Sequence, residues 1–298
     1  MTTPSDTTAP GLSLLARPSG GLAMLAVDQR EALRAMLAEH TDGPVTDAAV
    51  TDFKLLATRE LTPHASAVLL DKQFVLDRAL AEGAVDPACA LIAAADEFIP
   101  GSAPGEFVGD VRIDEAVDPA HYAAAGAVAL KLLVLWRRDE PARARIDMVE
   151  DFVGRCRIAG VLAIIEPLCR PSRDGSGLDR EAAIVAAARE LGGLGADLYK
   201  GEVPLAGRGT VEELTEACRP LHDAVGSPWV VLSSGVDADD FFDAVRAAVL
   251  AGASGFLAGR AVWKGCVGAA DLLHALRADA VPRLERLGLI VDDALAQR

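Results

Sequence analysis

The sequence predicts a single α/β domain folded as a closed (β/α)8 TIM barrel, and three observations lead to that prediction. Eight short apolar runs recur along the chain, segments of helical period separate them, and nearly every run ends in a polar residue. Eight strand–helix units in 298 residues match this fold, whose active site gathers residues from the carboxyl ends of its strands. A doubly wound open sheet would use fewer strands and cluster its polar residues at one switch point.

The apolar runs have the length and character of strands that are buried on both faces. They are residues 22–28, 66–71, 90–96, 128–136, 161–167, 197–204, 229–235 and 255–260. The segments 179–196 and 237–253 show a clear helical period, and the second has Asp237 as its expected N-cap and Gly252 near its end. No compositional break divides the chain, so residues 1–298 are expected to form one domain behind a flexible tail of residues 1–12.

Composition and charge exclude several classes of function. Hydrophobic residues make up 51% and aromatic residues 4%, so the core must be built from Ala, Val and Leu. The net charge of −15 argues against nucleic acid and against an anionic membrane surface as partners. Five widely spaced cysteines without a C-x-x-C motif, and a polar N-terminus without an apolar signal region, predict a cytoplasmic protein with free thiols.

Lys200 is the residue that most needs an explanation, because it interrupts an otherwise apolar run. Desolvation and a nearby cation both favour a neutral amine, which can attack a carbonyl carbon. Lys131 on another strand can supply that cation, Glu166 can transfer protons, and Asp28 can hydrogen-bond a hydroxyl or the amine. Strand alternation places Glu202 on the same face as Lys200. The alternative is a buried ion-pair network without chemistry.

The five histidines are isolated and none ends an expected strand, so neither a catalytic metal nor another cofactor is expected. The last two strands instead predict an anion site, because small residues and backbone N–H groups lie beside an arginine. This phosphate site would comprise Ser234, Gly235, Gly259 and Arg260. The alternative is that the glycines only serve tight turns.

Polar residues after the first two strands could hold the far end of an extended substrate. They are Gln29, Arg30, Lys72 and Gln73. Helix capping and surface contacts are an equally simple explanation for each of them taken alone.

These residues and their surroundings resemble the class I ketose-bisphosphate aldolases of the tagatose-bisphosphate aldolase group, and more closely its sulfofructosephosphate aldolase branch. The matching stretches are "GGLAMLAVDQREALRAML" (20–37), "TDFKLLATRELTPHASAVLLDKQF" (51–74), "AAADEFIPG" (93–101), "ALKLLVLWRRDE" (129–140), "IIEPLCRP" (164–171), "GADLYKGEVPL" (195–205), "PWVVLSSGVD" (228–237) and "GASGFLAGRAVW" (252–263). Two of them, "ADEFIPG" and "LWRRDE", look more like the sulfosugar branch. One departure is Gly201, where the group's motif more usually has an apolar β-branched residue; it could loosen the strand or widen the space behind an imine.

The resemblance implies a barrel aldolase with its Schiff-base lysine at Lys200, supported by Lys131, Glu166 and Asp28. It implies a ketose 1-phosphate as substrate, whose phosphate would bind at the predicted anion site, and a homodimer or homotetramer. The expected reaction is cleavage of 6-deoxy-6-sulfofructose 1-phosphate to dihydroxyacetone phosphate and 3-sulfolactaldehyde. Cleavage of tagatose or fructose 1,6-bisphosphate is the main alternative, and a pyridoxal-phosphate barrel and a non-catalytic binding barrel are two further ones.

Overall fold

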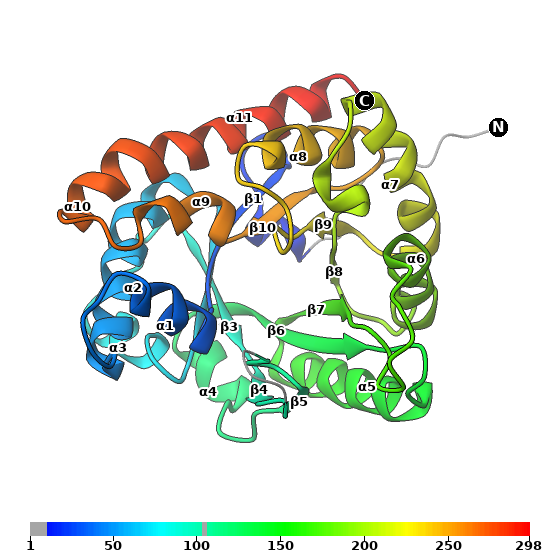
Figure 1. The fold of residues 1–298 in the computed structure, drawn as a ribbon, viewed down its shortest axis with the longest axis horizontal. Coiled ribbons are helices and arrows are strands. Elements are labelled where there is room, and N and C mark those ends of the chain that lie inside the picture. Colours follow the sequence, from blue (N-terminus) through cyan, green and yellow to red (C-terminus); the bar gives the residue numbers. More distant parts are fainter. Residues whose placement is uncertain (1–10, 103–105) are drawn as a thin grey trace.

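The predicted barrel is confirmed by the computed structural model, which describes residues 11–102 and 106–298. Eight parallel strands close in the order β1-β10-β9-β8-β7-β6-β3-β2, and helices surround them (Figure 1). The strands are β1 (Leu22–Val27), β2 (Ala67–Asp71), β3 (Ala90–Ala94), β6 (Ala127–Trp136), β7 (Leu162–Cys169), β8 (Leu198–Gly201), β9 (Trp229–Val231) and β10 (Gly255–Ala258). Each corresponds to one of the eight apolar runs.

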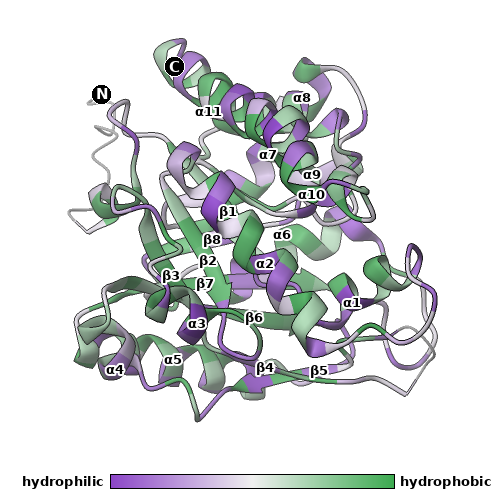
Figure 2. Ribbon diagram, turned by 90° about the vertical axis from the view of Figure 1, so that its left-hand side faces the viewer, coloured by the Kyte–Doolittle hydropathy of each residue, from purple (hydrophilic) through white to green (hydrophobic). Residues whose placement is uncertain are grey.

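Helices follow the strands and cover the outside of the barrel. They are α1 (Glu31–Ala38), α2 (Asp47–Leu61), α3 (Leu76–Ala81), α4 (Pro119–Ala124), α5 (Ala142–Ala159), α6 (Arg180–Leu191), α7 (Val211–Val225), α8 (Asp240–Leu250), α9 (Arg260–Trp263), α10 (Leu272–Ala275) and α11 (Val281–Ala296). Hydrophobic and hydrophilic residues alternate along these helices (Figure 2), and buried hydrophobic helix residues pack with the strands in the main core. Among the described residues, no helix is both long enough and apolar enough to cross a membrane.

The predicted N-cap of α8 was wrong by two residues. The helix begins at Asp240 after Asp239, and Asp237 instead accepts a hydrogen bond from the Asp239 amide in the preceding turn. Residues 1–10 of the predicted tail lie outside the described residues. Leu12, which the prediction also placed in the tail, is fully buried with Leu15 against the barrel interior.

The barrel interior is built in layers, because side chains alternate between its two faces along each strand. An apolar layer includes Ala26, Ala94, Ala129, Ile164 and Leu198. The residue two positions further along each of these five chain segments is polar and buried. These five polar residues are Asp28, Asp96, Lys131, Glu166 and Lys200. The fold therefore places one polar layer directly above an apolar floor.

A two-stranded antiparallel hairpin follows β3 and was not predicted. It consists of β4 (Asp96–Ile99) and β5 (Asp110–Ile113). Val111 of the hairpin packs with Leu133 and Leu168 in a small apolar cluster at the mouth of the barrel. The hairpin thus forms part of the wall around the mouth.

Candidate active site

Lys131 lies at the centre of the polar layer, with its ammonium group surrounded by three carboxylates. Its Nζ is 2.8 Å from Asp28 Oδ2, 2.7 Å from Asp96 Oδ2 and 3.1 Å from Glu166 Oε2. The Lys131 side chain is fully buried. Because a buried charge requires close partners, this arrangement satisfies the lysine where burial alone would have neutralised it.

The charges within this cluster reinforce one another. Burial disfavours the charged form of Lys131, but Asp28, Asp96 and Glu166 outweigh burial and hold its pKa well above the usual value. Burial likewise opposes ionisation of Asp28, yet the cations of Lys131 and Lys200 keep its pKa below the usual value. At neutral pH Lys131 is therefore protonated and Asp28 is ionised.

Lys200 shares a carboxylate with Lys131. Its Nζ is 2.9 Å from Glu166 Oε1, and the residue is only 3% exposed. Glu166 thus bridges the two lysines through its two oxygens. Although Lys131 lies within ion-pair distance of Oε2, this oxygen has no hydrogen-bond partner among the described residues. It therefore remains able to accept a proton from another group.

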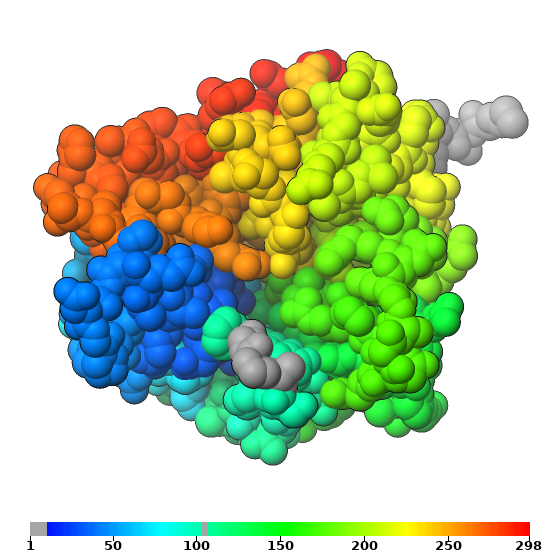
Figure 3. All heavy atoms as spheres, viewed as in Figure 1, coloured from blue at the N-terminus to red at the C-terminus, as the bar shows by residue number. Residues whose placement is uncertain are grey.

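A cavity of about 720 Å³ opens above this cluster. Asp28, Glu166, Ser234 and Arg260 are among the residues that line it. The space-filling view shows the molecule hollowed near the centre of this face (Figure 3). The two lysines contact the lining carboxylates but do not line the cavity themselves, so a ligand would meet Glu166 before it reached Lys200.

The residues of the predicted phosphate site lie together after β9 and β10. Arg260 Nη2 donates a hydrogen bond to Ser234 Oγ at 2.9 Å. Gly235 has a φ of +78°, which disfavours a side chain there. A Cβ at Gly259 would lie 2.4 Å from the carbonyl oxygen of Ala26, so this position also requires glycine. Ser234 and Arg260 line the cavity, whereas the two glycines do not.

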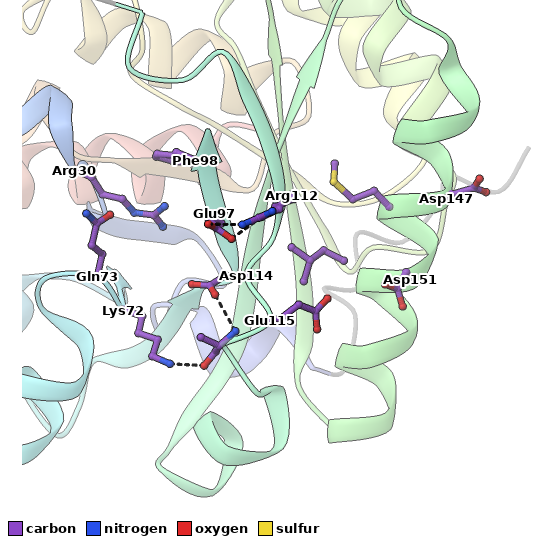
Figure 4. Close-up of a pocket in the computed structure, with 13 residues that line it drawn as sticks. Arg30, Lys72, Gln73, Glu97, Phe98, Arg112, Asp114, Glu115, Asp147 and Asp151 are labelled. Atoms are coloured by element: carbon purple, nitrogen blue, oxygen red, sulfur yellow. Dashed lines mark hydrogen bonds and ion pairs between the residues drawn. The ribbon is translucent and has the colours of Figure 1, made fainter. Parts of the chain in front are cut away.

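The four residues predicted for the far end of the substrate are divided between two hollows. Gln29, Arg30 and Gln73 line the cavity with Glu166. Lys72 does not, and instead lines a neighbouring groove of about 1310 Å³, where its Nζ donates to the Ala116 carbonyl (Figure 4). Lys72 is therefore placed beside the cavity rather than in it.

The charge of Arg30 is already compensated inside the protein. Its Nη2 pairs with Asp96 Oδ1 at 2.8 Å, and the guanidinium lies 4.1 Å from the ring centroid of Phe98 on the hairpin. Its buried Nε has no hydrogen-bond partner among the described residues. Gln29 similarly donates to Asp28 Oδ1 at 3.2 Å and keeps a buried Oε1 without a partner. Both residues thus retain polar atoms for a ligand's hydroxyl groups.

The two residues that follow Lys200 make their contacts away from its amine. Glu202 has no ion pair with Lys200; it accepts a hydrogen bond from the Cys169 amide at 2.7 Å and pairs with Arg180. Gly201 does not widen the space behind Lys200. A Cβ there would lie 3.3 Å from Leu221 of α7, on the outer face of the sheet.

Sequence reasoning missed two residues of this region. Asp96 was noted only as a polar strand end, yet it binds Lys131, Arg30 and the Leu133 amide. The alternation of Ile92, Ala94 and Asp96 was the signal that could have identified it. Arg170, which follows β7 and lines the cavity, was not considered.

The closed barrel and its buried lysine–carboxylate cluster define the class of protein: a barrel enzyme equipped for amine and carboxylate chemistry. Residues 22–265 match the family described as DeoC/LacD family aldolase, and the chain belongs to that family. It is a carbon–carbon lyase of the class I, Schiff-base type.

One sequence relative agrees with the family assignment, and two solved structures share the fold. Tagatose 1,6-diphosphate aldolase of Listeria monocytogenes serotype 4a (strain HCC23) is 29% identical over 281 residues, covering 85% of this chain and 80% of that protein. Fructose-bisphosphate aldolase of Plasmodium falciparum has a similar fold, with a TM-score of 0.67 at 14% identity, covering 98% of this chain and 96% of that one. An archaeal fructose-1,6-bisphosphate aldolase was solved with its catalytic Lys bound to a carbinolamine intermediate of the substrate. It has a TM-score of 0.62 at 15% identity, covering 95% of this chain and 98% of that one.

Proposed function

We propose that this aldolase cleaves 6-deoxy-6-sulfofructose 1-phosphate to dihydroxyacetone phosphate and 3-sulfolactaldehyde, with Lys200 as the Schiff-base residue. The observation that carries the catalytic part is the contact of Lys200 Nζ with Glu166 Oε1 at 2.9 Å, within a cluster that also holds Lys131. This geometry gives the amine a proton acceptor and a neighbouring fixed cation.

Formation of the imine begins with proton transfer from Lys200 to Glu166. The free amine attacks the C2 carbonyl of the substrate and gives a carbinolamine. Glu166 then returns the proton to the departing hydroxyl, which leaves as water, and a protonated imine remains. Lys131 keeps its charge throughout, since its pKa is held well above the usual value by three carboxylates that outweigh burial.

Cleavage follows from the electron demand of the protonated imine. A base removes the proton of the C4 hydroxyl, the C3–C4 bond breaks, and its electron pair moves to the imine to form an enamine. The aldehyde leaves, C3 is protonated, and water releases dihydroxyacetone phosphate and Lys200. Glu166 Oε2 is our candidate for the base, because it borders the cavity and has no hydrogen-bond partner among the described residues. Asp28 is placed to hydrogen-bond a substrate hydroxyl.

The 1-phosphate group is assigned to Ser234, Gly235, Gly259 and Arg260. The Arg260 guanidinium lies beside the Ser234 hydroxyl, so both can donate to one phosphate. Backbone N–H groups at positions 235 and 259, where the chain requires glycine, would add donors to this site. Gln29 and Gln73, with the free Nε of Arg30, are assigned to the far half of the substrate.

A sulfonate at the far end suits the charges of the cavity. A sulfonate carries one negative charge, whereas a phosphate monoester carries nearly two near neutrality. Asp28, Glu31, Glu106 and Glu166 all border the cavity, and Arg30 is compensated by Asp96, so few cations are available for a second dianion. Tagatose 1,6-bisphosphate is the second candidate, because the relative named above is 29% identical to this chain.

Borohydride reduction in the presence of dihydroxyacetone phosphate tests the catalytic assignment. We expect an adduct on Lys200 in the wild type and in Lys264→Ala, which removes an exposed lysine, but none in Lys200→Ala. An adduct on another residue would overturn the assignment. The substrate is tested separately, by comparing kcat/KM for the sulfosugar phosphate with that for tagatose and fructose 1,6-bisphosphates. A higher value for either bisphosphate would refute the sulfonate preference.

A further inference from the structure

Arg170 is a cavity arginine whose charge no carboxylate of the described chain compensates at close range. Three arginines line the cavity: Arg30, Arg170 and Arg260. Arg30 is paired with Asp96, and Arg260 donates to Ser234 within the proposed phosphate site. Arg170 has no ion pair within 4.0 Å and no side-chain hydrogen bond among the described residues. It is therefore the one lining arginine without a described partner.

The neighbours of Arg170 explain why it lacks a partner. Glu202 is the carboxylate that attracts the Arg170 charge most strongly, but it is already bound to Arg180 and to the Cys169 amide. Burial lowers the pKa of the Arg170 guanidinium, and the positive charges of Arg137 and Arg180 add to this effect. An arginine that is partly desolvated beside like charges gains more from an incoming anion than one in open solvent.

The position of Arg170 in the barrel suits the far end of the substrate. Strand β8, which carries Lys200, lies between β7 and β9. Ser234 follows β9, and Arg170 follows β7, where its amide bonds the Trp136 carbonyl and fixes its place in the wall. A substrate held at C2 by Lys200 and at C1 by the Ser234 side would extend its remaining carbons toward β7.

We infer that Arg170 binds the terminal oxyanion of the substrate and thereby selects ketose 1-phosphates that carry a second anionic group. This inference rests on the proposed function, because it assumes that the ketose is bound through C2 and C1 as described. The guanidinium fork can donate two parallel hydrogen bonds to a sulfonate or to a phosphate. Leu133 and Leu168 line the same cavity and limit water around such a contact.

The test compares substrates with and without the terminal anion in matched variants. Arg170→Gln, Arg170→Lys and the control Arg138→Gln are assayed with 6-deoxy-6-sulfofructose 1-phosphate, tagatose 1,6-bisphosphate and fructose 1-phosphate. Arg138 is exposed and lies outside the cavity lining, so its substitution removes one positive charge without altering the proposed contact. The measured quantity is the ratio of kcat/KM for each terminal-anion substrate to that for fructose 1-phosphate.

We expect the ratio to fall about 100-fold in Arg170→Gln, since a charged hydrogen-bonding pair is lost. Arg170→Lys should lose about tenfold, because the charge remains but the fork does not. A fall with only one of the two substrates would show whether sulfonate or phosphate is the anion recognised. A ratio unchanged in both variants would overturn the inference, and so would an equal fall in Arg138→Gln.

Two further measurements separate the possible failures. Thermal unfolding of each variant shows whether it folds. If Arg170→Gln does not fold, the kcat/KM ratio measured for Arg170→Lys tests the inference alone. Borohydride trapping of dihydroxyacetone phosphate by the wild type tests the imine chemistry without the far half of the substrate. Failure of this trapping would refute the proposed function, whereas normal trapping with an unchanged ratio would refute only the role of Arg170.

Discussion

Replacing Lys131 by methionine should destabilise the protein strongly and in a manner that depends on pH. The substitution keeps most of the side-chain volume but removes the ammonium group that three carboxylates share. Asp96 would retain Arg30, and Glu166 would retain Lys200. Asp28 has no other ion pair within 4.0 Å among the described residues, so it would be left as a buried charge with only the Gln29 hydrogen bond.

The magnitude follows from the burial of this pair. Removing one partner of a buried ion pair typically costs about 3–5 kcal/mol, because the other charge stays desolvated. For a domain of this size, about 2 °C is lost per kcal/mol, so Lys131→Met should lower Tm by roughly 6–10 °C at pH 7.5. Exposed Lys264→Met should change Tm by no more than about 1 °C.

The pH dependence tests the cause of this loss. In the wild type, burial opposes ionisation of Asp28, but Lys131 and Lys200 outweigh it and hold the folded-state pKa below 3.8, so the charge stabilises the fold at neutral pH. Without Lys131, burial dominates and raises that pKa above its unfolded value. The Asp28 carboxyl then favours folding only when protonated, and this contribution is lost as pH rises through the raised pKa.

The Tm difference between wild type and Lys131→Met should therefore narrow as pH falls from about 7.5 toward the ordinary Asp pKa of 3.8. The double variant Lys131→Met/Asp28→Asn should recover part of the lost stability at pH 7.5, because the stranded charge is gone. These measurements need only thermal or urea unfolding. A single variant destabilised by less than about 1 kcal/mol, or by the same amount at every pH, would refute the reasoning.

Three further predictions concern other parts of the molecule. Gly201→Ala should change the free energy of unfolding by less than about 1 kcal/mol, because the new methyl group faces Leu221. It should also leave unchanged the ratio of kcat/KM for the sulfonate substrate to kcat/KM for the bisphosphates, and a changed ratio would contradict this. Lys54→Met should lower the free energy of unfolding, measured in urea, by about 3–5 kcal/mol, since it leaves the fully buried Asp71 without its ion-pair partner. Adding Asp71→Asn should recover part of this free energy, and losses that simply add would contradict the pairing. Phe98→Ala should speed amide hydrogen exchange in β4 and β5, because the aromatic ring that stacks on Arg30 is lost. Unchanged exchange rates would show that this stacking does not stabilise the hairpin.

The strands could be predicted from the sequence because parallel barrel strands are buried on both faces. Such strands appear as continuous apolar runs, and a polar residue at the end of each marks the mouth. The polar layer was predictable for the same reason, since a period of two fixes which side of the strand a residue occupies. Asp28, Lys131, Glu166 and Lys200 were predicted to gather at the barrel mouth because each lies within or at the end of an apolar run, and the structure brings them together.

The alternation of side chains with a period of two no longer holds beyond the end of a strand, and the incomplete predictions concern residues at such ends. Strand β8 stops at Gly201, so Glu202 is free to turn toward Cys169 and Arg180. The hairpin of β4 and β5 is short and only half-buried, so it lacks the apolar run that announces a barrel strand. Ion-pair partners depend on the register between strands, which a single sequence does not contain; the pairing of Ala94 with Lys131 brings Asp96 beside that lysine.

The charge balance of the polar layer is consistent with the proposed mechanism. Three cations, from Arg30, Lys131 and Lys200, face three carboxylates, from Asp28, Asp96 and Glu166. Converting the Lys200 ammonium to a protonated imine leaves the total charge unchanged and moves its centre by about one bond length. The proton transfers through Glu166 only redistribute charge within the cluster. Because changing the net charge of a buried site is costly, a neutral cluster that stays neutral lets the imine form and break without large reorganisation of its surroundings.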